Sequence, residues 1–381
     1  MKILQIRQVD FNKKKYITSE IEMHRSLIKL GHETELWGIG DNNNKSEKFV
    51  RLFSAPLGRA SLFQLKMMFF AANYALKNEI DLIIVDTLSV FSILGLIFIR
   101  NKKLKIFIDI RTIIVESKSK YLDSRFKISL RFAAKYFTGA SFITEGTKSI
   151  IERKYGVSFK ENIIWSSGVN IDTFNRKNSN SEELYKKYPE LRDRFILFYH
   201  GSITENRGLD IVIDALNRVK GIIPKLMFVS LSNNNKYIKD YCKKKKYDLD
   251  NLFLIDAVDN YDVPKYINLA DVCIVPLPRI IYWEVSSPLK LMEYLAVGKP
   301  LILSKITAHL DVLDDKSNEF CYYFEPEDSN SLDSALLSIY KNIKKASQDA
   351  IKGRNIIKNR YTWDKQAEHL IDSIFKFNRG I

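Results

Sequence analysis

Short apolar runs alternate with helical patterns along the chain, and this alternation constrains the fold more than any other feature. Strands that alternate with helices form parallel sheets, so an α/β protein is expected. The first series of runs predicts strands at Lys2–Arg7, Glu33–Gly38, Asp81–Val85, Leu104–Asp109, Ser141–Thr144 and Ile163–Ser166. The second predicts strands at Phe195–His200, Lys225–Leu231, Asn251–Ile255, Val272–Val275 and Pro300–Leu303, with helices at about 208–220, 235–247, 262–270 and 288–297.

A polar segment separates the two series. Residues 175–194 read NRKNSNSEELYKKYPELRDR and offer few apolar side chains to a core. A chain of 381 residues is also longer than one hydrophobic core usually serves. We therefore predict a first domain over residues 1–178, a linker over 179–194, a second domain over 195–360 and a final amphipathic helix over 361–381.

Positive charge is concentrated in the first series. Residues 1–180 contain 30 Lys and Arg against 17 Asp and Glu, a net charge of +13, whereas the remainder carries +2. This asymmetry favours an anionic partner for the first domain, and an anionic membrane surface is preferred to nucleic acid. Lys13, Lys14 and Lys15 lie in the loop after the first strand and are the expected membrane or acceptor contact. General solubility is the alternative explanation of the charge.

The sequence favours a cytoplasmic protein. Residues 1–6 turn polar too quickly for a signal peptide and read better as a first strand. The longest apolar run, between Asp86 and Arg100, has 13 residues, whereas a membrane-spanning helix needs about 20. Three cysteines without metal-ligand spacing fit reduced thiols.

Residues 286–302, SSPLKLMEYLAVGKPLI, predict a loop, a helix, a glycine stop and a strand. Pro288 suits the start of a helix, whose free first-turn N–H groups bind anions. Lys290 lies in that turn, where the helix dipole disfavours a cation unless an anion is bound. Glu293 follows one turn later, where a carboxylate could accept two ribose hydroxyls. A capped helix with a solvated Lys and Glu is the structural alternative.

Residues 198–210, FYHGSITENRGLD, predict a buried strand, a turn and a helix. Gly201 permits a ligand to approach the backbone, and Arg207 could bind a diphosphate through two N–H groups. Strand–Gly–helix patterns are common. This one indicates a binding site only because it is expected at the same sheet edge as residues 286–293.

Both segments resemble the nucleotide-binding half of retaining GT-B glycosyltransferases of the family-four type. Residues 262–266 with 270–277, and residues 166–174, resemble the same group. The resemblance implies two Rossmann-like domains that face each other across a cleft, with a C-terminal helix that crosses back to the first domain. It implies a nucleotide-diphosphate sugar as donor substrate, no other cofactor and no metal.

The resemblance also implies roles for particular residues. Arg207 and Lys290 would neutralise the donor diphosphate as catalytic residues, and Glu293 would hold the ribose. Gly201, Ser202, Ser287 and Leu289 complete the expected donor site. Two positions depart from the group: Ser202 stands where a basic residue is usual, and Val285 where an acid is usual, so Glu284 is the candidate replacement.

In the first domain, Asp109 ends a predicted strand, where relatives place a His or Asp against the donor sugar or acceptor. It is a third catalytic candidate, and capping of the next turn is the alternative. Arg111 is expected on the acceptor or membrane side. Residues 59–70 form a basic, very apolar helix, for which core packing is favoured over a membrane-facing position.

The expected function is transfer of a sugar to an acceptor hydroxyl in cell-surface polysaccharide or glycolipid synthesis, in the cytoplasm or peripherally at the inner face of the cell membrane. A sugar-nucleotide epimerase of the same fold is one alternative, although the segments offer few paired acid and base groups. A non-catalytic sugar-nucleotide-binding subunit is the other, because of the departures at Ser202 and Val285.

Overall fold

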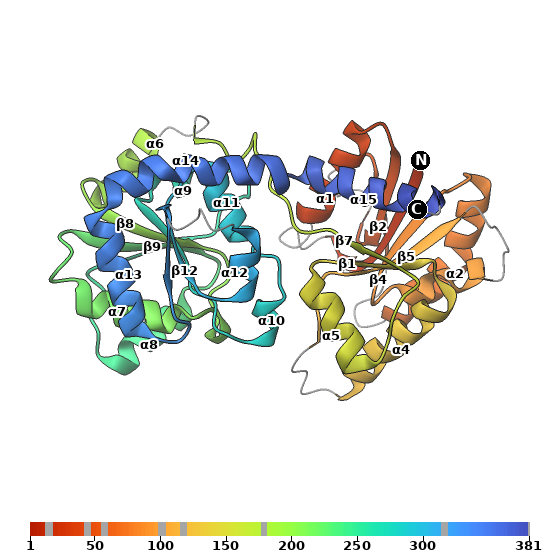
Figure 1. The fold of residues 1–381 in the computed structure, drawn as a ribbon, viewed down its shortest axis with the longest axis horizontal. Coiled ribbons are helices and arrows are strands. Elements are labelled where there is room, and N and C mark those ends of the chain that lie inside the picture. Colours follow the sequence, from red (N-terminus) through yellow and green to blue (C-terminus); the bar gives the residue numbers. More distant parts are fainter. Residues whose placement is uncertain are drawn as a thin grey trace. The chain divides into compact units, whose positions relative to one another are not determined.

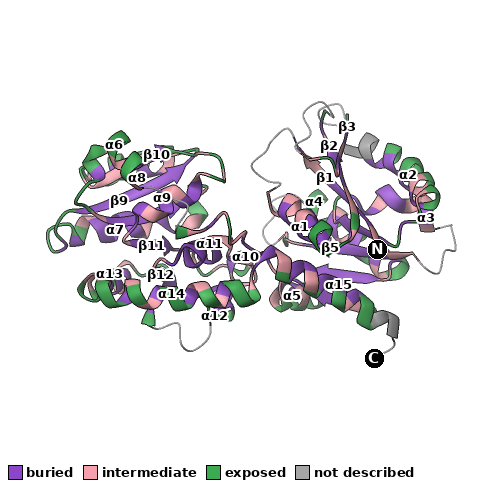
Figure 2. Cartoon of the chain, turned by 90° about the horizontal axis from the view of Figure 1, so that it is seen from above, coloured by how far each residue is buried: buried purple, intermediate pink, exposed green. Residues whose placement is uncertain are grey.

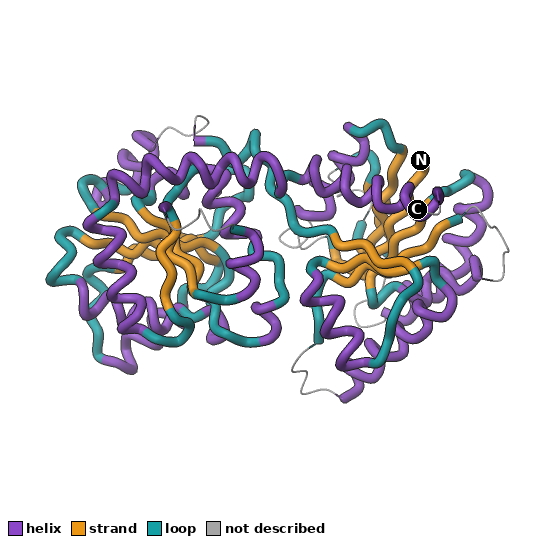
Figure 3. The backbone as a smooth tube through the Cα atoms, viewed as in Figure 1, coloured by secondary structure: helices purple, strands orange, loops and turns teal. Residues whose placement is uncertain are grey.

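The computed structural model describes residues 1–11, 18–41, 47–54, 60–97, 104–114, 120–176, 181–313 and 319–379. The chain divides into two compact units. Unit 1 comprises Met1–Gly168, Val285–Ser287 and Trp363–Ile381, and unit 2 comprises Val169–Glu284 and Pro288–Thr362. Each is built on one parallel sheet with helices on both faces (Figures 1 and 3). The predicted α/β class with two parallel-sheet halves is confirmed.

Unit 1 contains a parallel sheet with the strand order β3-β2-β1-β4-β5-β6-β7. Its strands are β1 (Lys2–Asp10), β2 (Glu33–Ile39), β3 (Val50–Phe53), β4 (Leu82–Asp86), β5 (Lys105–Ile110), β6 (Gly139–Phe142) and β7 (Glu161–Ile164). Its helices are α1 (Thr18–Lys29), α2 (Ala60–Lys77), the short 3₁₀ segment η3 (Val90–Ile93), α3 (Leu94–Ile97), α4 (Lys120–Tyr136), α5 (Glu145–Tyr155) and α15 (Trp363–Arg379).

Two apolar clusters cover the faces of this sheet. Helices α2, α4 and α5 pack on one face, where Met67, Leu130 and Ile151 are buried against the strands. Helices α1 and α15 pack on the other face, where Leu27 and Leu370 are buried. Figure 1 shows the two sets of helices on opposite sides of the sheet. A segment more than 330 residues from α1 therefore completes the core of unit 1.

Unit 2 contains a parallel sheet with the strand order β10-β9-β8-β11-β12-β13. Its strands are β8 (Phe195–His200), β9 (Leu226–Ser232), β10 (Leu252–Asp256), β11 (Val272–Val275), β12 (Leu301–Ser304) and β13 (Cys321–Phe324). Its helical segments are α6 (Ser181–Lys187), η5 (Pro189–Leu191), η6 (Glu205–Arg207), α7 (Leu209–Val219), α8 (Lys236–Lys245), α9 (Val263–Leu269), α10 (Ile281–Glu284), α11 (Leu289–Val297), α12 (Thr307–Val312), α13 (Ser329–Lys341) and α14 (Ile343–Arg360).

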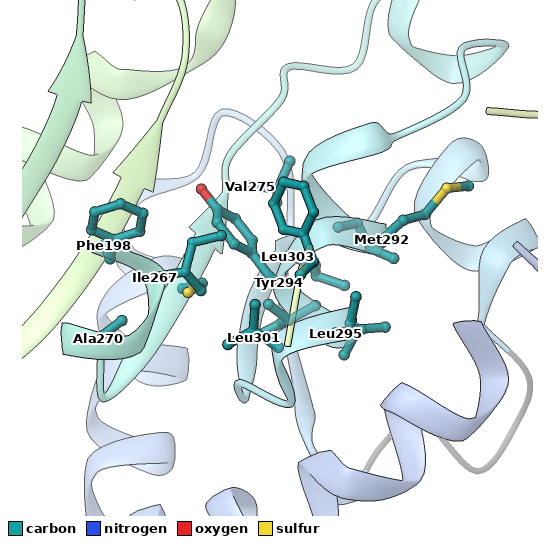
Figure 4. Packing of buried hydrophobic residues seen from close by; sticks show 14 of the residues in the cluster. Phe198, Ile267, Ala270, Val275, Met292, Tyr294, Leu295, Leu301 and Leu303 are labelled. Carbon is teal, nitrogen blue, oxygen red and sulfur yellow. The ribbon is translucent and has the colours of Figure 1, made fainter. Parts of the chain in front are cut away.

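Helix α11 is the most deeply buried helix in the part of unit 2 that bears the candidate site. Every residue from Leu291 to Val297 is buried. Tyr294 and Leu295 share a cluster with Phe198 of β8 and Leu301 and Leu303 of β12 (Figure 4). Gly298 ends the helix in the left-handed conformation, as the predicted glycine stop requires. This packing fixes the position and direction of the helix.

Two features of the fold differ from the sequence prediction. Residues 179–194 were expected to form a linker, but they contain α6 and η5, whose Leu184 and Leu191 enter the core of unit 2. The chain instead passes from unit 1 to unit 2 after Gly168. Strands β3 and β13 are additional edge strands of four residues each. In the described residues, no helix has the length and apolarity needed to cross a bilayer.

Candidate functional site

The candidate site lies where the strand order of unit 2 reverses, between β8 and β11. Ligands of open parallel sheets bind beyond the carboxyl ends of the strands at such a point. β8 ends at His200, and Gly201 follows with a φ of 112°, a conformation that residues with a side chain rarely adopt. Helix α11 begins nearby at Leu289, and its first-turn N–H groups form a natural anion site.

Lys290 lies directly against Gly201. A Cβ atom at position 201 would stand 2.5 Å from Lys290 Cε and 3.0 Å from Nζ, so glycine leaves the space that this side chain occupies. The pKa of Lys290 is lowered to about 8, first by burial and then by the positive charge of Arg207, while Glu293 opposes the shift. The ammonium group is thus held where its charge is unfavourable without an anion.

Arg207 is positioned by an aromatic ring. Its guanidinium lies 4.2 Å from the centre of the Trp283 ring, and Trp283 Nε1 donates to the carbonyl of Asn206 at 2.8 Å. The Nε atom of Arg207 is buried and has no hydrogen-bond partner. Among the described residues, neither Arg207 nor Lys290 has a carboxylate within 4.0 Å. Two mutually repelling cations without an ion-pair partner would be stabilised by a bound anion.

Glu293 forms part of a buried hydrogen-bonded group one turn along α11. Its Oε2 lies 2.9 Å from His200 Nε2, and the Tyr294 hydroxyl lies 3.0 Å from His200 Nδ1. The backbone N–H of His200 also donates to the Tyr294 hydroxyl at 3.0 Å. The imidazole thereby fixes the carboxylate of Glu293 at the carboxyl end of β8.

The remaining residues that were predicted to bind the donor are less closely associated with the candidate site. Ser202 is exposed, and its carbonyl accepts a hydrogen bond from the Tyr199 hydroxyl at 2.9 Å. Leu289 is the first residue of α11. Glu284 is already engaged, because its Oε2 accepts from the backbone N–H of Thr307 at 2.7 Å and its Oε1 lies 3.4 Å from Arg279 Nε. Its carboxylate anchors the start of α12, and we do not assign it a donor contact.

Residues Val285–Ser287 precede α11 and belong to unit 1. The Val285 carbonyl accepts hydrogen bonds from the hydroxyls of Thr144 at 2.7 Å and Thr147 at 3.0 Å. Ser287 Oγ lies 2.8 Å from Ser166 Oγ, so the hydroxyl of this predicted donor residue is bound within unit 1. This hydrogen-bonded segment continues directly into Pro288 and α11.

Asp109 is a structural carboxylate in this fold. It is buried at the end of β5, forms an ion pair with Arg7 and accepts from Ser141 Oγ at 2.7 Å. A group so enclosed and paired does not present a free oxygen to a substrate. Arg111 stacks on Trp165 at 3.7 Å and donates to the Trp165 carbonyl at 2.8 Å, and burial lowers its pKa to about 10. Lys13, Lys14 and Lys15 lie outside the described residues.

Sequence reasoning gave no role to His200, Tyr294 or Trp283. The place of His200 in the site could have been predicted from the sequence, because this residue ends the strand that precedes Gly201 and must lie at the same edge as Glu293. The place of Trp283 could not, since its contact with Arg207 joins residues 76 positions apart through loops whose path the sequence does not define.

The two Rossmann-like halves match the structures of glycosyltransferases of the GT-B fold class. Residues 194–342 match the family model described as Glycosyl transferases group 1. The HepE protein of Anabaena in complex with UDP has a similar structure, with 14% identity, a TM-score of 0.78, and 99% of this chain and 100% of that chain covered.

Two other structures show the same fold. Sucrose-phosphate synthase from Thermosynechococcus elongatus is 13% identical, with a TM-score of 0.76 and full coverage of both chains. WaaG, a glycosyltransferase involved in lipopolysaccharide biosynthesis, is 13% identical, with a TM-score of 0.66 and coverage of 97% of this chain and 98% of that one. No curated protein sequence matches the chain. Residues 194–342 of unit 2 thus resemble the glycosyl transferases group 1 domain.

Proposed function

We propose that the protein is a glycosyltransferase that moves a sugar from a nucleotide-diphosphate sugar to an acceptor hydroxyl, with retention at the anomeric carbon. The observation that carries this proposal is the pair of unpartnered cations, Arg207 and Lys290, beside Gly201 and the first turn of α11. A diphosphate supplies the negative charge that this arrangement lacks. Glu293, held by His200, is available to the ribose hydroxyls.

The reaction breaks the bond between the anomeric carbon and the terminal diphosphate oxygen. The acceptor oxygen forms the new bond to that carbon on the same face, and the departing phosphate oxygen takes the acceptor proton. Negative charge therefore grows on the diphosphate in the transition state. Arg207, Lys290 and the amides of Leu289 and Lys290 stabilise that charge, and such electrostatic stabilisation is usually the largest contribution to the rate.

The test is the replacement of Arg207 or Glu293 by alanine. Each variant loses a charge-assisted contact of about 1.5–3 kcal/mol and should lose donor affinity and turnover while circular dichroism shows that the fold persists. A thermal-shift screen against UDP-, GDP-, ADP- and CMP-sugars identifies the donor, and product analysis follows. UDP is the first nucleotide to try because HepE binds it. Near-normal donor affinity and rate in both variants would remove the site from this position.

We further propose that no metal ion is needed, because two cations and a helix N-terminus together meet the diphosphate charge. Activity should survive EDTA. Loss of activity in the chelator that magnesium or manganese restores would contradict the proposal.

For the acceptor, we propose a lipid-linked saccharide or a growing cell-surface glycan at the inner face of the cell membrane. The support is the net charge of +13 on residues 1–180. The role of WaaG in lipopolysaccharide biosynthesis makes this acceptor class the first to assay.

A further inference from the structure

Helices α2 and α4 share one face of the sheet in unit 1, and their inner residues occupy a common core. Met67, Ala71 and Ala75 of α2 are buried in the same cluster as Phe126 and Leu130 of α4. The 3₁₀ segment η3 lies against both helices, and the Phe91 ring stands 5.3 Å from that of Phe132. The outer sides of α2 and α4 therefore belong to one surface of unit 1.

Helix α2 carries exposed residues (Figure 2), and several of them form a stripe of large apolar side chains on its outer side. Leu65, Phe69 and Leu76 are 55%, 68% and 48% exposed, and their spacing places them on one side of the helix. The sequence favoured core packing for this segment. That prediction holds for Met67 and its inner neighbours but is wrong for this stripe.

Helix α4 repeats the pattern. Tyr121 and Ile128 are 70% and 57% exposed, and Tyr136 is also exposed at the end of the helix. Several large exposed apolar side chains on two helices of one sheet face are unusual for a surface in contact only with water and indicate an interaction site. A partner at this surface must bury these side chains.

Basic residues flank both apolar stripes. Lys66 and Lys77 belong to α2, and α4 carries exposed Lys120, Arg131 and Lys135. Among the described residues, none of these five has a carboxylate within 4.0 Å. Asp123, the one acidic residue in the two helices, lies 3.4 Å from Lys154 and accepts from the Tyr155 hydroxyl. The positive charge of this surface is therefore uncompensated.

We propose that the outer surface of α2 and α4, defined by Leu65, Phe69, Leu76, Tyr121, Ile128 and Tyr136 with their flanking Lys and Arg residues, docks on an anionic membrane. Amphipathic helices with aromatic and aliphatic side chains beside lysines insert into the boundary between headgroups and acyl chains. The basic residues attract the anionic headgroups, and the apolar stripes enter beneath them. A nucleic acid would use the cations but leave the aliphatic stripe in water.

This inference names the partner surface of the proposed glycosyltransferase, and its test needs no sugar nucleotide. Failure of vesicle binding and failure of glycosyl transfer are therefore separate results. It also places the contact in α2 and α4 instead of the loop of Lys13, Lys14 and Lys15.

The experiment is co-sedimentation of the full chain with phosphatidylglycerol-rich vesicles and with pure phosphatidylcholine vesicles, at low and high salt. The charge variant is Lys120→Ser, Arg131→Ser, Lys135→Ser, and its matched control is Lys243→Ser, Lys244→Ser, Lys245→Ser on α8. The control removes three exposed lysines from a helix in unit 2. The apolar variant is Leu65→Ser, Phe69→Ser, which leaves the charge unchanged.

Wild type should sediment with the anionic vesicles at low salt and be released at high salt. The charge and apolar variants should each lower the partition coefficient by about tenfold or more, and the control by less than about twofold. Circular dichroism checks the fold, and Tyr121→Ser with Ile128→Ser replaces the apolar variant if that variant unfolds.

Three results would overturn the proposal. Wild type could stay in the supernatant at low salt. The control could lose as much binding as the charge variant, which would show an effect of net charge alone. The apolar variants could bind as wild type does, which would show that the apolar stripes do not enter the bilayer.

Discussion

Lys290 should make ligand binding at the candidate site depend on pH. Burial and the nearby charge of Arg207 lower the pKa of Lys290 to about 8, so in the free protein its ammonium loses its proton as the pH rises through that value. A bound diphosphate stabilises the charged form. The nucleotide should therefore bind best below about pH 8, and binding near that pH should be accompanied by proton uptake.

We predict that nucleoside diphosphate affinity falls between pH 7 and pH 9.5, where the terminal phosphate, with a pKa near 6, is already ionised. Lys290→Met should bind about tenfold or more weakly at pH 7 and show no further loss above pH 8. Calorimetric titration in buffers of different ionisation enthalpy measures both affinity and proton uptake. An equal decline in the variant would assign the pH dependence to another group.

For single residues of the candidate site, the sequence predicted their positions in the fold better than their contacts. Gly201, Arg207, Lys290 and Glu293 were expected at one sheet edge because each follows a strand or begins a helix, and the structure places them there. The engagement of Glu284 with Thr307 could not be foreseen, since it depends on where α12 starts relative to α10.

Among the elements, the segment Val285–Ser287 is held within unit 1 by hydrogen bonds. The hydroxyls of Thr144 and Thr147, at the start of α5, both donate to the Val285 carbonyl. Gly146 leaves space for the Val285 side chain, because a Cβ atom there would stand 2.9 Å from Val285 Cγ1. These contacts anchor the peptide that leads into α11.

We predict that Thr144→Val with Thr147→Val lowers the free energy of unfolding by about 1–3 kcal/mol, because the Val285 carbonyl loses both of its hydrogen-bond donors. Thr144→Ser with Thr147→Ser keeps both donors and should restore the stability. Urea unfolding measures the effect. Equal impairment of both double variants would mean that the methyl groups, and not the hydrogen bonds, matter.

Element prediction succeeded where the apolar pattern was strong. Strand β8 was predicted without error, and α11 within a residue. Strands β6 and β7 begin and end two residues before their predicted positions, and the short edge strands β3 and β13 were missed. Edge strands are half exposed, so polar residues such as Arg51 interrupt the pattern that identifies central strands.

For the whole molecule, two buried histidines predict sensitivity to acid. Burial lowers the pKa of His309 to about 4 and, with the charge of Arg7, lowers that of His24 to about 3. In the unfolded chain both groups titrate near pH 6.5. Below that value the unfolded state takes up protons that the folded state does not, so the free energy of unfolding falls as the pH drops.

We predict that the free energy of unfolding falls between about pH 6.5 and pH 4. The fall should be roughly 3 kcal/mol smaller in His309→Asn. An asparagine amide can keep the hydrogen bond that His309 Nδ1 makes with the Ser304 carbonyl at 2.7 Å. Urea unfolding at a series of pH values measures the slope, with the exposed His369→Asn as the control. An unchanged slope in the His309 variant would assign the acid sensitivity elsewhere.

The division into units was the hardest feature to predict. Polarity in residues 179–194 suggested a linker, yet Leu184 and Leu191 are buried in the core of unit 2, and Tyr185 and Tyr188 pack against it. A few apolar residues can outweigh many charged ones, because only one side of a surface helix needs to be apolar.

The position of α15 in unit 1 has a consequence for synthesis. Ile3, Leu82, Ile84 and Phe107 lie in the cluster that Trp363, Leu370 and Ile374 complete. A ribosome makes the strands of that sheet long before it makes α15. This face of the sheet therefore lacks α15 until all of unit 2 has been translated. The nascent chain offers a sheet face of exposed aliphatic and aromatic residues to chaperones during that interval. The last segment of unit 2 ends at Thr362, so that unit is complete before α15 is made.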